Sequence, residues 1–207
     1  MSDELDSVKT AEPRRAYHHG ALRVALLEAA EAVIAERGID GFSLRETARR
    51  AGVSPSAAAH HFGDARGLLT ALAAEAFRRF GDALEAADVG DSRLERVRSQ
   101  GIAYVRFAIA EPAKFDLMWR YALLDRSDPE YLEASRRAFA MLDRVVRGEE
   151  GVERGQHDPS VAPAIAAWAM VHGFARLALD GAFGTAPADT ERVVRDLLPA
   201  VLEHLRI

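Results

Sequence analysis

The residues whose types and spacing could recognise another molecule cluster in one short stretch, residues 41–62, which reads GFSLRETARRAGVSPSAAAHHF. Ser43, followed three residues later by Glu46, is the pattern of a capping box and predicts the start of a short helix. Ser54, followed by Pro55, predicts a second helix after the intervening glycine, because serine caps a helix and proline fits its first turn. Two short helices joined by a tight turn form a helix-turn-helix, whose second helix can enter the major groove of DNA.

A plain helical hairpin inside an all-α core would show the same local pattern without touching DNA. The charge distribution is an independent observation on this point. Residues 14–66 hold eight Arg against six Asp and Glu, whereas the whole chain has a net charge of -5. A locally positive region can approach phosphates, while the acidic remainder argues against a protein that coats nucleic acid without sequence preference.

Residues 17–69 resemble the DNA-binding domain of the tetracycline-repressor family of bacterial transcription regulators. The resemblance rests on a first helix that ends in ERG, on the helix-turn-helix, and on HF followed by a charged turn into LL, all at the family's spacings. It implies a homodimer that binds double-stranded DNA, so the operator should be an inverted repeat. The candidate DNA-binding residues are Ser43, Arg45, Ser54, Pro55, Ser56, Ala57, His60, His61 and Arg66.

The sequence departs from this family at two positions that usually contact phosphates. Ala59 stands where the recognition helix usually carries a Tyr, and Ala65 stands where the next helix usually begins with a Lys. Phosphate contacts position a protein on DNA, so their loss should lower the affinity for all sequences. His60 and Arg66 could take over these two roles. The alternative is a helical ligand-sensing protein with weak or lost DNA binding.

Two further helices must position the helix-turn-helix. Apolar residues at intervals of three and four predict a helix over residues 20–37, stopped by Gly38, that packs behind the motif. The same periodicity predicts a helix over residues 65–87. The family resemblance implies that this second helix links the two regions and turns a movement of the body into a change in the position of the recognition helix.

The first residues of the chain show no such periodicity. Residues 1–12 are polar and acidic, which predicts disorder. Arg14, Arg15, His18 and His19 then form a basic lead-in. In this family such an arm contacts the minor groove or phosphates, and a solvated tail is the alternative.

The body of the chain reads as helical throughout. Periodicity and caps predict helices over residues 92–110, from Pro112, from Asp128 to about Gly148, over 160–182 and over 190–205, with a polar loop at 152–159. The sequence contains no β-hairpin signal. The predicted fold is therefore all-α, with an arm (residues 1–16), an N-terminal three-helix helix-turn-helix domain (17–66), and a C-terminal helical ligand-binding and dimerisation domain (67–207).

The helix over residues 160–182 is apolar on more than one face, which predicts burial against two partners. Its Trp168, His172 and Gly173 match the Trp-x-x-x-His-Gly signature of one class of C-terminal domain within the family, and this match implies a ligand pocket beside Trp168 and His172. A core tryptophan hydrogen-bonded to a core histidine is the alternative. The candidate lining is mainly apolar, so a small, mainly apolar effector is expected. Its residues are Tyr104, Phe107, Phe115, Met118, Trp119, Tyr121, Phe139, Trp168 and His172.

The last two predicted helices carry a surplus of apolar residues. In the family they supply the four-helix bundle of a homodimer, and packing within one chain is the alternative. The candidate dimerisation residues are Phe174, Leu177, Val194, Leu198, Val201 and Leu202.

Composition and missing motifs argue against other classes of protein. The chain has no cysteine, which excludes disulfides and thiolate metal sites. It lacks an unbroken apolar run of about 18 residues and a signal peptide, so we expect a cytoplasmic protein with no membrane partner. It also lacks a Gly-rich phosphate loop, a nucleophile elbow and a metal-spaced His/Glu cluster. We therefore expect no cofactor and no metal, and an enzyme is only a remote alternative.

Overall fold

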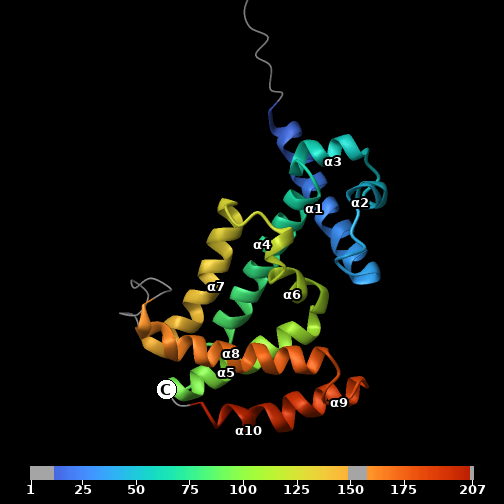
Figure 1. The fold of residues 1–207 in the computed structure, drawn as a ribbon. Helices are drawn as coiled ribbons and strands as arrows, with labels where there is room; N and C mark the ends of the chain where they lie inside the picture. The colour runs from blue at the N-terminus through green and yellow to red at the C-terminus, as the bar shows by residue number, and fades with distance from the viewer. Residues whose placement is uncertain (1–11, 149–157, 206–207) are drawn as a thin grey trace, which may run out of the picture. The chain divides into compact units, whose positions relative to one another are not determined.

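The computed structural model describes residues 12–148 and 158–205, and for residues 12–19 and Pro187 it describes the backbone alone. Within these ranges every regular element is a helix (Figure 1). The all-α prediction is therefore confirmed. The disorder predicted at the N-terminus falls on the residues before Glu12, and the predicted polar loop falls largely on residues 149–157. Residues 1–11 and 149–157 lie outside the described residues, whereas Glu12 begins the first helix and Pro159 begins a short 3-10 helix.

The chain divides into two compact units, with the boundary after Leu68. In the first unit, α1 packs on α2 and α2 packs on α3. Leu26, Ala30 and Val33 of α1 are fully buried, as are Ala48 of α2 and Ala58 of α3. The helices of this unit are α1 (Glu12–Arg37), α2 (Leu44–Arg50), α3 (Pro55–Phe62) and the first residues of α4 (Ala65–Ala86).

Helix α1 begins at Glu12 and not near residue 20 as predicted. The basic lead-in, expected to be an arm, is therefore part of the helix. Pro13 lies in the first turn, where a backbone N–H has no helical partner to bind, so it does not oppose this early start. Between Pro13 and Gly20 the sequence contains neither glycine nor proline. Periodicity missed this extension because the apolar stripe begins only at Leu22.

The two helices of the motif start where the sequence predicts. The Oγ of Ser43 accepts a hydrogen bond from the backbone N–H of Glu46 at 3.4 Å and caps α2. The Oγ of Ser54 accepts one from the N–H of Ala57 at 3.1 Å and caps α3. Between the helices Gly52 has φ +71, a left-handed conformation that glycine adopts without steric cost. These local signals are sufficient to form the turn.

The second unit is organised around α5, which contacts α6, α7, α8 and α10. A Cβ on Gly101 of α5 would lie 3.2 Å from side-chain atoms of both Val171 and Leu202, so this glycine permits the close approach of α8 and α10. Besides the rest of α4, the helices of this unit are α5 (Arg93–Ala110), α6 (Pro112–Met118), η1 (Tyr121–Leu123), α7 (Pro129–Arg147), η3 (Pro159–Val161), α8 (Ala162–Leu179), α9 (Pro187–Arg192), η4 (Val193–Leu197) and α10 (Leu198–Leu202).

The C-terminal helices differ from the prediction in two ways. Helix α8 ends at Leu179 and not at residue 182, and Gly181 follows with φ +79. The single helix predicted over 190–205 is instead α9, a π-helical turn η4, and α10. Pro199 offers a physical reason, because proline lacks the N–H that binds the carbonyl four residues earlier and its ring clashes with that carbonyl. The wider π turn precedes this proline.

Candidate functional site

The exposed surface of α3 carries most of the candidate DNA-binding residues of the first unit. Ala58 is fully buried and fixes which face of α3 points inward. Ser56 and His60 are exposed on the opposite face and Ser54 and Pro55 are exposed at the helix start, whereas Ala57 and His61 are half-buried. The Oγ atoms of Ser54 and Ser56 lie 2.9 Å apart, so the two hydroxyls are joined at the helix start. Small and polar side chains there allow a DNA backbone or base edge to come close.

Helix α2 carries three arginines in different electrostatic situations. Arg49 donates to both carboxylate oxygens of Glu46 at 2.8 Å, and Arg50 donates to Glu46 at 2.9 Å and to Glu36 at 2.6 and 2.8 Å. These hydrogen bonds, first from Arg49 and then from Arg50, lower the pKa of Glu46 to about 2. The predicted capping box is therefore wrong in its second half: the carboxylate of Glu46 binds arginines, and only the Ser43 half of the box is formed.

Arg45 is the third arginine of α2, and it is exposed. Among the described residues it makes neither an ion pair nor a side-chain hydrogen bond, so its guanidinium is available to a base edge or a phosphate. Arg66 is exposed in the first turn of α4, while Ser43 and Ala59 are half-buried. The first unit therefore presents Arg45, the start of α3, His60 and Arg66 to solvent.

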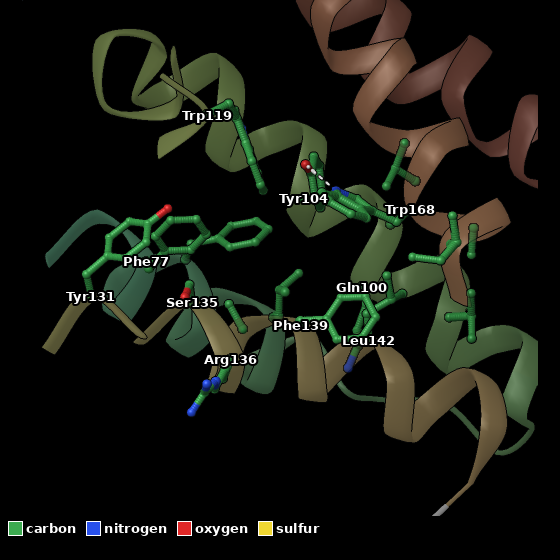
Figure 2. Close-up of a pocket in the computed structure, with 18 of the residues that line it drawn as sticks. Phe77, Gln100, Tyr104, Trp119, Tyr131, Ser135, Arg136, Phe139, Leu142 and Trp168 are labelled. Carbon is green, nitrogen blue, oxygen red and sulfur yellow. Dashed lines mark hydrogen bonds between the residues drawn. The ribbon is translucent and has the colours of Figure 1, made fainter. Parts of the chain in front are cut away.

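The second unit contains a cavity of about 590 Å³ (Figure 2). Its walls come from α4, α5, α7 and α8, together with residues of the segment between α6 and α7. The lining residues are Phe77, Phe80, Leu84, Val97, Gln100, Gly101, Tyr104, Trp119, Tyr121, Arg126, Tyr131, Leu132, Ser135, Arg136, Ala138, Phe139, Leu142, Ile165, Ala167, Trp168, Val171 and Leu205. A volume of this size accommodates a small organic molecule.

The structure places the predicted ligand-binding residues in two groups. Tyr104, Trp119, Tyr121, Phe139 and Trp168 line the cavity, whereas Phe107, Phe115, Met118 and His172 do not. The second group requires a correction. Phe115 and Met118 have no exposed surface and belong to the core, and the ring of Phe107 packs 5.1 Å from that of Phe80.

His172 supports the cavity wall without facing the cavity. The Tyr104 hydroxyl accepts a hydrogen bond from Nε1 of Trp168 at 3.1 Å and lies 2.8 Å from Nδ1 of His172. Since an indole N–H can only donate, the Tyr104 proton is free to bind Nδ1, which fits a neutral imidazole. Burial lowers the pKa of His172, and the charge of Arg176 lowers it further. Trp168 and His172 therefore share Tyr104 as a partner, and neither hydrogen-bonds the other.

Two parts of the cavity were missed from the sequence. Phe77, Phe80 and Leu84 form a wall from α4, although the sequence marked them only as a helix stripe. A polar edge from Arg126, Tyr131, Ser135 and Arg136 was not anticipated either. One signal was available for it: Leu132, Arg136 and Phe139 are four and three residues apart and so share one face of α7.

The predicted dimerisation residues include both buried and exposed side chains. Leu198 and Leu202 have no exposed surface, and Phe174 and Val194 are only 5% and 8% exposed. These four residues pack within the chain, and Leu202 lies close to Gly101 of α5. They must therefore be removed from the predicted dimer surface. Leu177 is 50% exposed, and Leu197, which was not predicted, is 41% exposed. Val201 is half-buried.

The outward side of α8 is apolar as well. Ala162, Ala166, Ala169, Gly173 and Leu177 are all exposed and recur at intervals of three and four, which places them on one face. By length and composition the segment Pro159–Leu179 could cross a membrane, but core helices of soluble proteins meet the same criterion. An exposed apolar helix face of this kind is typical of a surface that another protein covers.

Comparison with known proteins gives matches along most of the chain. A family model described as "Tetracyclin repressor-like, C-terminal domain" matches residues 97–201, and one described as "Bacterial regulatory proteins, tetR family" matches residues 26–72. The HTH-type transcriptional repressor AcnR of Corynebacterium glutamicum is 30% identical over 167 residues, which cover 77% of this chain and 78% of AcnR. Assignment to the Trp-x-x-x-His-Gly class stays a prediction.

Two solved structures share the fold. A protein of unknown function from Rhodococcus sp. RHA1 is 34% identical, with a TM-score of 0.71, and the match covers 94% of this chain and 98% of that one. PfmR, a TetR family transcriptional regulator from Thermus thermophilus, is 22% identical, with a TM-score of 0.64 and coverage of 88% and 99%.

Proposed function

Because the chain belongs to the tetracycline-repressor (TetR) family and is a DNA-binding transcriptional regulator, we propose that it acts as a repressor that a small, mainly apolar molecule releases from its operator. The observation that carries the proposal is the cavity of about 590 Å³ in the second unit of a chain whose first unit is a helix-turn-helix. A ligand in that cavity would contact α4, whose first residues belong to the first unit.

We assign DNA recognition to residues 17–66 and ligand binding and dimerisation to residues 67–207. Base contacts come from Arg45 and the start of α3, and Arg66 and His60 supply phosphate contacts in place of the missing Lys and Tyr. Two recognition helices in a symmetric homodimer face successive major grooves about 34 Å apart, which requires an inverted-repeat operator. The protein acts in the cytoplasm, without enzyme activity.

The apolar outer face of α8 supports the homodimer. It exposes Leu177, and α8 is the helix whose opposite side closes the cavity through Ala167 and Trp168. A dimer contact through α8 would therefore rest on the same helix that contacts the ligand. Ligand binding could then change the separation of the two recognition helices. Release requires only that the ligand bind better to the conformation with the wrong separation.

The experiment starts from an operator obtained by selection from random DNA duplexes, with binding measured by fluorescence anisotropy. Ala167→Trp fills the cavity, because Ala167 lines it and is only 2% exposed. The variant should bind operator within about threefold of wild type without ligand, and should lose its response to ligand. Retention of the full response would show that the effector acts elsewhere.

A second candidate function is favoured by Ala59 and Ala65, since each removes a usual phosphate anchor. In that case the chain is a ligand sensor with weak DNA binding. The salt dependence of operator binding separates the two, because each phosphate contact adds to the slope of affinity against salt concentration. If the protein is a repressor in which Arg66 replaces the missing Lys, Arg66→Ala should reduce the slope of operator affinity against salt concentration. A sensor shows no sequence-selective binding at any salt concentration.

A further inference from the structure

One end of the cavity is polar and positively charged. Tyr121 and Arg126 reach it from the segment before α7, and Tyr131, Ser135 and Arg136 reach it from the first half of α7. The guanidinium carbon of Arg126 lies 4.8 Å from the centre of the Tyr121 ring. Burial raises the pKa of Tyr121 and Tyr131, and the charge of Arg126 partly offsets the rise in both. Both phenols therefore stay protonated and can donate hydrogen bonds beside a cation.

We define the cationic end of the cavity as Tyr121, Arg126, Tyr131, Ser135 and Arg136. No acidic side chain of the cavity lining balances its positive charge. The residues that line the cavity include two arginines and neither Asp nor Glu. Among the described residues, neither of these arginines forms an ion pair. Eight other arginines of the second unit pair with carboxylates, namely Arg78, Arg79, Arg96, Arg120, Arg137, Arg147, Arg176 and Arg195.

Arg137 is next to Arg136 in the sequence, but unlike Arg136 it forms ion pairs among the described residues. It donates to Asp82 at 2.7 Å and also binds Glu85, both on α4, so its charge is neutralised. Arg136, one position earlier, is among the residues that line the cavity and has no such carboxylate among the described residues. The uncompensated positive charge of the cavity thus lies at its edge.

The cavity is elongated away from this end. Tyr131 and Leu142 both line it, and they are eleven residues apart on α7, which corresponds to about 16 Å along the helix axis. Figure 2 shows Tyr131, Ser135 and Arg136 on one side of the view and Gln100, Leu142 and Trp168 on the other. Between these ends the walls are aromatic and aliphatic. A chain-like or flat apolar body fits such a space.

The cationic end of the cavity reaches solvent. Tyr121 is 42% exposed, and Arg126 and Arg136 are exposed. An anionic group held there keeps part of its hydration, so it avoids most of the cost of burying a charge. Arginine adds planar donor pairs that match a carboxylate. An apolar body could then occupy the interior while its charged end stays at the edge.

We propose that the effector is an amphipathic carboxylate, whose apolar body fills the aromatic cavity and whose carboxylate is bound by Arg126 and Arg136 with the Tyr121, Tyr131 and Ser135 hydroxyls. This inference rests on the proposed function, because it names the class of molecule that the same cavity takes. It refines the expectation of a small, mainly apolar effector by adding one anionic group. A neutral ligand would leave both guanidinium groups without an anion.

The test uses tryptophan fluorescence of the full chain, because its two tryptophans are Trp119 and Trp168 and both line the cavity. The probes are dodecanoate and 1-dodecanol, which share an apolar chain and differ in charge. Wild type should bind dodecanoate at least about tenfold more tightly than the alcohol, a difference of about 1.4 kcal/mol. Arg126→Gln and Arg136→Gln should each reduce this preference, and the double variant should abolish it while binding the alcohol as before.

Arg144→Gln is the matched control, because Arg144 is an exposed arginine of α7 that does not line the cavity. It should keep the wild-type preference. Equal binding of acid and alcohol by wild type, an unchanged preference in the double variant, or binding of neither probe would each overturn the inference. Operator binding by the unliganded protein is measured on the same samples. If it is intact, the proposed regulator function survives the failure of this inference.

Discussion

The hydroxyl of Tyr104 lies 2.8 Å from Nδ1 of His172, and this contact ties α5 to α8 beside the cavity. Tyr104 lines the cavity and His172 does not, so the histidine orients a wall residue without contacting the ligand. The histidine must be neutral at Nδ1 to accept this hydrogen bond. Protonation of His172 should therefore lower the stability of the second unit.

This relationship predicts a pH dependence of stability. Because the folded-state pKa of His172 lies below its usual 6.5, the unfolded chain binds more protons as the pH falls through that value. The contribution of His172 is thus complete above about pH 6.5 and is lost on acidification. Urea unfolding at about pH 7.5 and about pH 5.5 should show a smaller loss of stability in His172→Gln than in wild type. His204→Gln, which changes an exposed histidine, is the control and should keep the wild-type loss.

If His172→Gln lost as much stability as wild type over the same pH interval, the histidine would not be held neutral by the fold. The hydrogen bond to Tyr104 would then have to be assigned to a different tautomer or charge state.

Arg45 should carry base specificity, whereas Arg49 should not. Arg45 is exposed and has no ion pair among the described residues, while Arg49 is bound to Glu46. Arg45→Ala should cost about 1–3 kcal/mol on the selected operator and should relax the preference at one base position per half-site. Arg49→Ala should cost less. Anisotropy titrations against single-base operator variants measure both effects, and an equal loss on every sequence would reassign Arg45 to a phosphate.

The dimer surface should depend on exposed and not on buried leucines. Leu177→Glu places a charge on the outer face of α8 and should give monomers with unchanged helicity. Leu198→Glu buries a charge in the core, since Leu198 has no exposed surface, and should unfold the second unit. Light scattering and circular dichroism distinguish the two outcomes. A folded Leu177→Glu dimer would place the interface elsewhere.

Gln100 should lower the stability of the ligand-free protein. Its side chain is 1% exposed, and neither its amide oxygen nor its amide nitrogen has a hydrogen-bond partner among the described residues. A buried amide without partners costs about 1–3 kcal/mol, so Gln100→Met, which preserves volume, should raise the free energy of unfolding by about 1–2 kcal/mol. Chemical denaturation measures the change. Lower stability in the variant would mean that water satisfies the amide.

Local signals predicted the fold well because they act within a few residues. Ser43 and Ser54 cap the helices they were expected to cap, and Gly52 makes the turn between them. The first helix was predicted too short because apolar periodicity does not register a helical segment that lacks an apolar stripe. The break near Pro199 was missed for a different reason: a periodicity of 3.6 residues assumes a regular helix, and a π turn interrupts it.

The site was predicted less completely because an apolar stripe does not reveal what covers it. Phe115 and Phe139 look alike in the sequence, yet Phe115 is in the core and Phe139 faces the cavity. Leu198 was assigned to a partner chain, whereas the structure packs it within its own chain. Arg126 and Arg136 were missed because the sequence does not show which of its many arginines pair with carboxylates. For Arg136, the face of α7 that it shares with Leu132 and Phe139 was the available signal.

The proposed function requires that a ligand in the cavity controls operator binding. Its most direct test is the operator affinity of wild type and Ala167→Trp, each with and without saturating dodecanoate. Dodecanoate should weaken operator binding by wild type at least about tenfold, or about 1.4 kcal/mol, and should leave Ala167→Trp within about threefold of its ligand-free value. An equal loss of affinity in both proteins would contradict it, because dodecanoate would then act without occupying the cavity.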